Sequence, residues 1–166
     1  MDPKDVVMEC AQGLPQFSDG RIDFSDAEIC PVVNVIVIHD DEILILKRSS
    51  KVSTHKNMWD CVGGYMDELI SPEKKAAKEL KEELGISSGN MMSISSGEPF
   101  RLDEKEKRWI VFPVMVELRD KPDISLDWEH TEYAWIKKSR IEGFRLSKKI
   151  KDILYRCTVK HDDQSS

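Results

Sequence analysis

The sequence predicts a sandwich of strands and helices, of the α+β or α/β class. Three observations support this prediction. The run 32–38 is β-branched except for Asn34, which is typical of a central strand. A helix with clear end signals lies between Ser71 and Gly85. Further strand-like segments follow that helix, and helical spacing returns near the end of the chain.

The segments before the helix predict a hairpin and a short third strand. Asp40-Asp41 separates two apolar runs and is a natural turn. In chain order we predict strand 32–38, strand 42–47, a polar loop at 49–57 and strand 58–62, which runs into Gly63-Gly64. Residues 1–30 offer few signals beyond turn residues.

The helix has recognisable signals at both ends. Ser71 is a natural N-cap, Pro72 suits the first helical position, and Gly85 is a natural stop. At about 100° per residue, four side chains fall in one apolar sector and are predicted to face the core. They are Ala76, Ala77, Leu80 and Leu84.

The segments after the helix predict more strands and one more helix. We predict strands at 94–100 and 109–118 joined by the charged turn 103–107, then strand 132–136 and helix 147–156. Pro113 has no amide hydrogen to donate, so it predicts an edge position or a bulge in its strand.

Composition and charge exclude several classes of protein. A chain of 166 residues is most simply one domain. Its net charge is −6, with no basic block, so we expect no polymeric nucleic acid as partner, although a nucleotide is not excluded. The four cysteines are dispersed, and no secretory pattern or membrane-length apolar run is present. We therefore expect a reduced, cytoplasmic protein without a membrane partner.

The helix carries three carboxylates on one face. Glu79, Glu82 and Glu83 are spaced i, i+3 and i+4, so they are neighbours and repel one another. A hard divalent cation turns that repulsion into binding, because Mg²⁺ and Mn²⁺ prefer oxygen ligands. Composition alone favours an ordinary solvated face. The preceding Gly63-Gly64 and its loop favour a metal site.

At these residues the chain resembles the Nudix hydrolase family. The box of that family places a glycine, a glutamate, an Arg-Glu pair, a Glu-Glu pair and a final glycine at fixed spacing. The residues in register are Gly64, Glu79, Leu80, Glu82, Glu83, Gly85 and Ile86. Two positions depart from the box, because Ile70 stands in place of its first glutamate and Lys78 in place of its arginine.

The resemblance implies a fold, a reaction and a cofactor. The fold is a Nudix-type α/β/α sandwich with a mixed central sheet and a catalytic loop–helix. The reaction is metal-dependent hydrolysis of a diphosphate linkage in a nucleoside diphosphate derivative or a similar small molecule. The implied cofactor is Mg²⁺ or Mn²⁺, held by Glu79, Glu82, Glu83 and the carbonyl of Gly63. We assign catalytic roles to Glu79, Glu82 and Lys78.

The two departures affect how the first metal glutamate is oriented. In the family, the first box glutamate pairs with the arginine, and that pair orients the residue at Glu79. Ile70 forms no salt bridge, and Lys78 offers a point charge in place of a planar fork. Glu68 or Asp67 would reach Lys78 if the loop shifts.

Substrate-binding candidates lie in segments away from the box. They are Arg48, His55, Trp59, Arg108 and Glu129. Arg48 and His55 suit phosphate contact, although each is equally an ordinary exposed side chain. Trp59 has two possible roles, stacking on a nucleotide base or packing in the core, and the sequence favours the core position. Glu129, with Glu132 behind it, is a candidate for a further metal ligand or the base, against a plain surface carboxylate.

Two other functions stay open. An isoprenoid-diphosphate isomerase of the same fold would use Cys61, and a non-catalytic Nudix-fold binding module would have lost activity through Ile70. We divide the chain into an N-terminal extension at 1–30, the Nudix hydrolase domain at 31–157 and a polar tail at 158–166. The extension packs either on its own domain or on a partner subunit, so a homodimer is also open.

Overall fold

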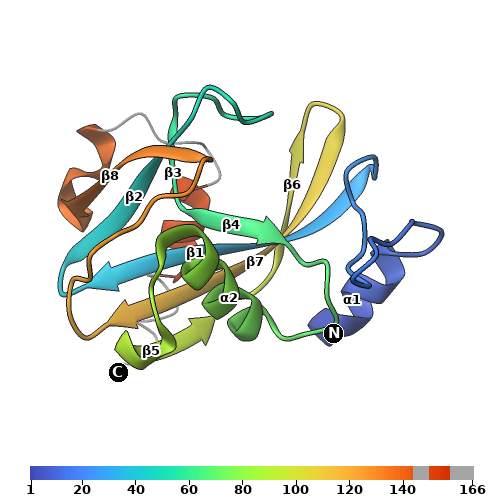
Figure 1. The fold of residues 1–166 in the computed structure, drawn as a ribbon, viewed down its shortest axis with the longest axis horizontal. Helices are drawn as coiled ribbons and strands as arrows, with labels where there is room; N and C mark the ends of the chain where they lie inside the picture. Colours follow the sequence, from blue (N-terminus) through green and yellow to red (C-terminus); the bar gives the residue numbers. More distant parts are fainter. Residues whose placement is uncertain (144–149, 158–166) are drawn as a thin grey trace.

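The β-branched run of the sequence forms the centre of the sheet. The computed structural model describes residues 1–143 and 150–157. In it, β1 (Ile29–His39) pairs in parallel with β7 (Lys107–Leu118) and antiparallel with β2 (Glu42–Arg48) and β4 (Val62–Tyr65). The sheet is therefore mixed, as predicted (Figure 1).

The remaining elements extend this centre. The described residues form one eight-stranded sheet with the order β3-β2-β1-β7-β5, in which β8 pairs with β2 and β6 pairs with β7. The other elements are α1 (Pro3–Cys10), β3 (Trp59–Asp60), α2 (Pro72–Leu84), β5 (Met91–Ser96), β6 (Phe100–Glu104), β8 (His130–Lys137) and two short 3₁₀ turns, Ser88–Asn90 and Lys138–Gly143. Residues 150–157 are helical.

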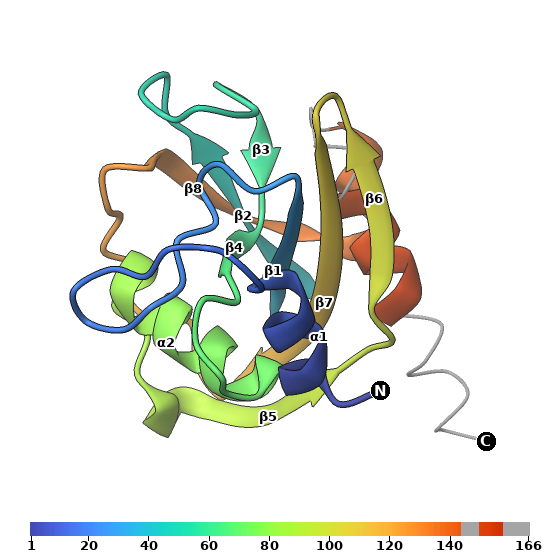
Figure 2. The same cartoon turned by 90° about the vertical axis from the view of Figure 1, so that its right-hand side faces the viewer.

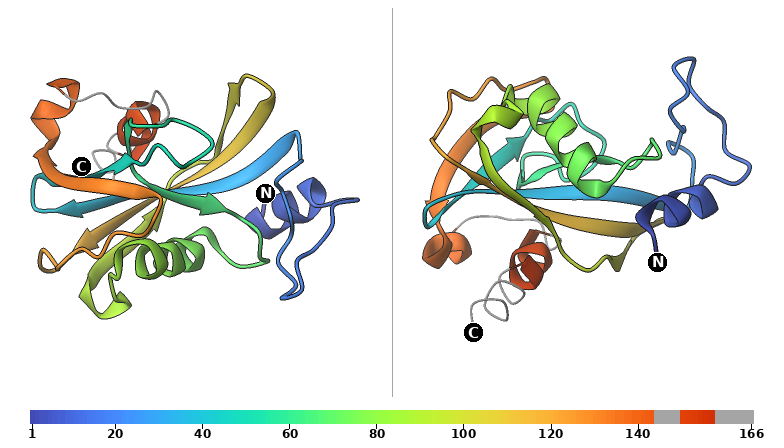
Figure 3. Two further views of the ribbon diagram at one scale, coloured as in Figure 1. Left: turned by 45° about the horizontal axis from the view of Figure 1, so that its top comes forward. Right: turned by 90° about the horizontal axis from the view of Figure 1, so that it is seen from below.

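Helices cover both faces of the sheet. α2 lies on one face, and helix 150–157 lies on the other, as the two views of Figure 3 show. α1 lies beside one end of the sheet, next to the start of β1 (Figure 2). The predicted α+β sandwich is confirmed.

Alternation along the strands divides the core into two clusters. The cluster under α2 contains Val33, Val35, Val37, Leu44, Leu46, Phe112, Val114 and Val116. The cluster under helix 150–157 contains Val32, Ile36, Ile38, Ile43, Ile45, Val111 and Ile136. Successive residues of β1 thus belong to opposite faces, because side chains alternate along a strand. Both faces are apolar because both are covered.

The ends of α2 agree with the sequence prediction. The Ser71 hydroxyl accepts a hydrogen bond from the amide of Lys74, Pro72 opens the helix, and Gly85 closes it with φ +70°. A left-handed residue at this position favours glycine because a side chain there would clash with the backbone. Ala76, Leu80 and Leu84 are fully buried, as expected for the core-facing sector.

Two strand predictions and the predicted position of Pro113 are wrong. The predicted strand 94–100 is two strands, β5 and β6, separated by residues 97–99. Pro113 does not lie at an edge, because β7 has β1 on one side and β5 and β6 on the other, and it does not lie at a bulge, because the register with β1 runs through it without a shift. It is tolerated there because it faces the junction between β5 and β6, where its carbonyl accepts a hydrogen bond from Gly97. The predicted strand 58–62 is also divided, into β3 and β4.

The N-terminal extension contains a helix that the sequence reading missed. Asp2 caps α1 by accepting a hydrogen bond from the amide of Lys4, and Pro3 is its first residue. Val7 is fully buried in the cluster under α2, so the extension packs on its own domain. Of the predicted helix 147–156, residues 147–149 lie outside the described residues, as does the tail 158–166. Within the described chain, no helix has the length and hydropathy of a membrane span.

Candidate functional site

Two glycines let the backbone of β4 approach its neighbours closely. β4 pairs with β1 so that Gly63 lies opposite Asn34 and Gly64 opposite Val33. A Cβ atom on Gly64 would lie 2.5 Å from Glu79 Oε1, and one on Gly63 would lie 2.5 Å from Asn34 Nδ2. Any side chain at Gly64 would therefore displace the Glu79 carboxylate, which explains why glycine precedes the acidic helix.

The three glutamates of α2 do not share one environment. Glu79 and Glu83 are buried, with 8% and 6% of their surface exposed, whereas Glu82 is exposed. Glu79 and Glu83 are one helical turn apart, so they project in nearly the same direction. Burial of two carboxylates beside the sheet is costly unless a cation compensates them. Their roles as metal ligands stay predictions.

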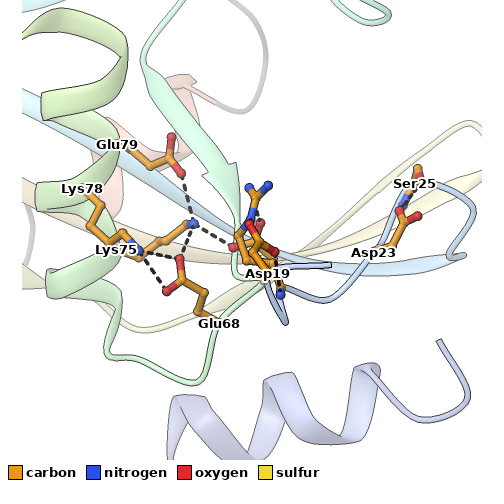
Figure 4. Close-up of polar contacts among 9 residues, drawn as sticks. Asp19, Asp23, Ser25, Glu68, Lys75, Lys78 and Glu79 are labelled. Atoms are coloured by element: carbon orange, nitrogen blue, oxygen red, sulfur yellow. Dashed lines mark hydrogen bonds and ion pairs between the residues drawn. The ribbon is translucent and has the colours of Figure 1, made fainter. Parts of the chain in front are cut away.

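A buried lysine compensates part of this charge. Lys75 Nζ lies 2.7 Å from Asp67 Oδ1 and 3.3 Å from Glu79 Oε1. Figure 4 shows its side chain reaching from α2 between Glu79 and the loop residue Glu68. Burial alone lowers the pKa of Lys75, but the hydrogen bond to Asp67 and the charge of Glu79 outweigh burial and raise it. Lys75 is therefore charged.

Glu79 is subject to opposing influences. Burial raises the pKa of the Glu79 carboxyl, and the charges of Glu82 and Asp67 add to that increase. Lys75 acts in the other direction through its charge and its hydrogen bond. The net pKa is raised above its ordinary value, so Lys75 compensates Glu79 only in part.

The Lys78 side chain pairs outside this buried group. Lys78 Nζ lies 2.6 Å from Glu68 Oε1 and 2.9 Å from Glu68 Oε2 (Figure 4). This is one of the two partners that the sequence offered for Lys78 in the absence of a glutamate at position 70. The pair is partly exposed, and burial of Glu68 is offset by Lys78, which lowers the pKa of that carboxyl.

A second acidic group meets Glu83 from the loop before β8. Carboxylate oxygens of Glu83, Asp127 and Glu129 all lie within 4.8 Å of one another. Burial, followed by the charges of Glu79, Glu129 and Asp127, raises the pKa of Glu83 to about 10. Within residues 1–143 and 150–157, no hydrogen-bond donor reaches Glu83 Oε2, although that atom is buried. At neutral pH without a cation, Glu83 is protonated.

Two further residues lie around this acidic group. The positive charge of Arg48 lowers the pKa of both Glu83 and Glu129, against the larger effect of their burial. Arg48 is fixed by a hydrogen bond from its Nε to the Thr54 carbonyl at 2.9 Å. His130 Nδ1 lies 3.1 Å from Asp127 Oδ1. The sequence candidates Arg48, Glu83 and Glu129 are thus brought together.

The other substrate candidates have partners elsewhere. His55 Nε2 lies 3.2 Å from Glu104 Oε2 at the end of β6, and Arg108 Nε lies 3.7 Å from Glu28 Oε1 in the N-terminal extension. Trp59 is partly buried and packs against the cluster under helix 150–157, the core position that the sequence favoured.

Asp127 and Lys75 were missed from the sequence. Asp127 was not among the predicted site residues, because nothing in one sequence sets its register against α2. Lys75 has a local signal, because it precedes Glu79 by four residues and i, i+4 pairs of opposite charge are neighbours on a helix. The apolar sector and the acidic sector of the helix meet there.

The chemistry of the donor set fits a hard divalent cation. The side chains that meet at this site offer carboxylate oxygens, and one of those oxygens is buried without a hydrogen bond from any residue that the structure describes. Mg²⁺ and Mn²⁺ bind such ligands, and a cation would replace the proton on Glu83. Nudix hydrolases in general use divalent metals.

A mixed sheet between helices, with a glycine pair against the buried glutamates of one helix, defines a Nudix-type sandwich. The family model described as the NUDIX domain matches residues 29–157. The chain belongs to the Nudix family. It is a Nudix-type pyrophosphohydrolase, of the enzyme class that hydrolyses nucleoside diphosphate derivatives.

Solved structures share this fold at low identity. The MutT protein from Methanosarcina mazei Go1 is 24% identical, with a TM-score of 0.68 over 82% of this chain and 97% of that one. A C. elegans Ap4A hydrolase is 17% identical, with a TM-score of 0.64 over 81% and 98%. The NUDIX domain of Shewanella oneidensis NrtR, complexed with ADP ribose, is 12% identical, with a TM-score of 0.66 over 79% and 87%. The comparison with curated proteins gives no match.

Proposed function

We propose that this protein hydrolyses the diphosphate linkage of a nucleoside diphosphate derivative, or of a similar small molecule, with Mg²⁺ or Mn²⁺ as cofactor. The observation that carries the proposal is the buried Glu83, whose Oε2 has no donor among the described residues and whose carboxylate meets those of Asp127 and Glu129. A buried, protonated carboxyl surrounded by carboxylates is a poor structural element but a good cation ligand.

Named residues supply the parts of the reaction. Glu79, Glu82, Glu83 and the Gly63 carbonyl would hold the cation, with Asp127 as an added ligand. When bound, the cation stabilises the charge that develops on the phosphoryl oxygens. The oxygen of water bonds to one phosphorus, the bond from that phosphorus to the bridging oxygen breaks, and the bridging oxygen leaves with the second product.

Glu129 is the candidate that accepts the proton of the attacking water. Burial, followed by the charge of Asp127, raises the pKa of Glu129 above its ordinary value. A carboxylate with a raised pKa is a stronger base than an exposed one and suits a reaction at neutral pH. Arg48, whose charge acts on Glu129 and Glu83, would bind a phosphate of the substrate.

The relatives are consistent with a nucleotide substrate. The names of the solved structures include an Ap4A hydrolase and a NUDIX domain complexed with ADP ribose, and Ap4A and ADP ribose are both nucleotide compounds that contain phosphoanhydride bonds. We therefore propose the same broad class here, without assigning the group attached to the diphosphate.

A panel of nucleoside diphosphate derivatives, incubated with Mg²⁺ or Mn²⁺ and assayed for phosphate-containing products, tests this proposal. We expect turnover of at least one compound, and loss of that turnover in Glu83→Gln. Glu106→Gln makes the same substitution at an exposed turn residue between β6 and β7 and provides the matched control. Turnover of no compound with either metal would contradict the proposal.

The two alternatives predict other results. The isomerase would need Cys61 to reach its substrate, but Cys61 is only 4% exposed and packs in the cluster under helix 150–157. An inactive binding module would bind the nucleotide in calorimetry without turning it over. Glu79 and Glu83 are both buried, and burial of carboxylates is costly unless they bind a cation. Their burial therefore favours an active metal site over a binding module that has lost activity.

A further inference from the structure

Lys75 is an unusual residue for the inner side of α2. It is only 4% exposed, whereas Lys74, Lys78 and Lys81 on the same helix are exposed. A buried lysine loses its hydration at a large cost in free energy, which close opposite charges offset. Its position therefore needs a reason beyond solubility.

Its contacts supply that reason. Lys75 Nζ donates to Asp67 Oδ1 at 2.7 Å and lies 3.3 Å from Glu79 Oε1 and 3.6 Å from Glu68 Oε1. The Glu79 carboxylate also lies against the backbone of Gly64, where a Cβ atom would be only 2.5 Å from Glu79 Oε1. Lys75 and Gly64 together leave the carboxylate little freedom to rotate.

Asp67 is itself fixed from the N-terminal extension. The amide of Ile22 donates to the Asp67 carbonyl at 2.9 Å, and Arg21 Nη1 lies 3.5 Å from Asp67 Oδ2. Figure 4 shows Asp19, which pairs with Arg21, beside this group. The extension thus contacts the loop that leads into α2.

The residues at the two departing box positions do not fix Glu79. Ile70 has no charge, and the Lys78 ammonium is bonded to both oxygens of Glu68 at 2.6 and 2.9 Å. Lys75 is the lysine whose ammonium lies beside Glu79.

We propose that Lys75 is a positioning residue that orients Glu79 for the cation, and that Asp67, fixed by the N-terminal extension, holds Lys75 in place. This inference rests on the proposed function, since it assigns Glu79 to a metal site. Residues that orient a metal ligand through a hydrogen bond contribute about 10–100-fold to metal affinity or activity. The extension is then part of the site and not only a cover for the core.

The test is a calorimetric titration of the full chain with Mn²⁺. Removal of Lys75 alone would also change the charge near the cation, so the main variant is Asp67→Asn/Lys75→Met, which leaves the net charge unchanged. We expect its Mn²⁺ affinity to fall by about 10-fold or more. Lys74→Met, a substitution at the neighbouring exposed lysine, is the matched control, with an affinity within about twofold of wild type.

Thermal unfolding followed by circular dichroism shows whether each variant is folded. If the double variant has no cooperative transition, Lys75→Arg gives the test, because it keeps the positive charge but replaces the compact ammonium beside Asp67 and Glu79 by a larger planar guanidinium. That variant is also expected to bind Mn²⁺ less tightly than wild type. A purely structural role would lower the melting temperature and leave the Mn²⁺ affinity of the folded protein unchanged.

The outcomes separate this inference from the proposed function. Wild-type protein that binds Mn²⁺, with weaker binding in the folded variant, supports both. Equal binding by wild type and the folded variant overturns the role of Lys75 and leaves the proposed function intact. A wild-type protein without a Mn²⁺ site overturns the proposed function, and the inference with it.

Discussion

Lys78 Nζ, in the middle of α2, lies 2.6 Å from Oε1 of the loop residue Glu68, and both side chains are partly exposed. One turn earlier on the same helix, Lys75 makes a pair of similar length with Asp67, but in that pair both residues are buried. Two lysines on one helix thus form ion pairs with adjacent loop residues in different environments. Their energetic contributions are expected to differ for that reason.

We predict that Lys75→Met lowers the free energy of unfolding by about 3–5 kcal/mol, because it leaves buried Glu79 without its cation and Asp67 with only the more distant Arg21. Lys78→Met is expected to lower it by only about 0.2–1 kcal/mol, since an exposed pair is screened by water. Urea unfolding of both variants measures the difference. Equal losses would show that burial does not distinguish the two pairs.

Glu83→Gln is predicted to stabilise the metal-free protein while it abolishes hydrolysis. Glu83 is buried beside Asp127 and Glu129 and takes up a proton when the metal-free chain folds at neutral pH, a cost that a neutral amide avoids. The measurements are urea unfolding in the presence of a chelator and turnover in the presence of Mn²⁺. A variant that loses both stability and activity would indicate that Glu83 has a structural role.

Gly64→Ala is predicted to reduce activity by about 100-fold, because a Cβ atom at this position would lie 2.5 Å from Glu79 Oε1 and 2.6 Å from its Cδ. The carboxylate must move to make room for the methyl group. Gly89→Ala is the matched control, since its Cβ atom would have no neighbour closer than 3.9 Å. Wild-type kcat in Gly64→Ala, measured at saturating metal, would show that Glu79 tolerates displacement.

Local signals in the sequence predicted much of the fold. Ser71, Pro72 and Gly85 set the ends of α2 because each acts within one turn of the chain. α1 begins with a similar signal, an N-cap residue followed by proline, in Asp2 and Pro3. It was not predicted, because a helix of 8 residues shows too little apolar periodicity in the sequence. Strand 32–38 was predictable because both of its faces are apolar.

The rest depends on contacts between segments that are distant in sequence. Asp127 lies in the loop that leads into β8. That loop meets Glu83 because β8 pairs with β2, which is itself a neighbour of β1 in the sheet. Pro113 was misassigned to an edge because the change of partner from β5 to β6 is a property of the whole sheet. The buried pairing of Lys75 needs the Asp67 loop to fold back on α2, which composition does not reveal.

The stability of the metal-free protein should depend on pH through Glu83. Its pKa is raised from an ordinary value of 4.5 to about 10 in the folded chain, so the folded state holds this proton more tightly than the unfolded state does. The stabilising contribution is therefore complete below pH 4.5 and is lost progressively as the pH rises towards about 10. Burial raises the pKa of Glu79 and Glu129 as well, so both act in the same direction.

We accordingly predict that the free energy of unfolding, measured in urea with a chelator present, declines between about pH 5 and pH 9. The decline should be smaller in Glu83→Gln, whose amide does not titrate, whereas Glu106→Gln should follow the wild type. Added Mn²⁺ should stabilise the protein more strongly as the pH rises, because the cation binds the ionised carboxylate and competes with the proton. A wild-type stability that rises over this range without metal would contradict the burial of an uncompensated carboxyl at position 83.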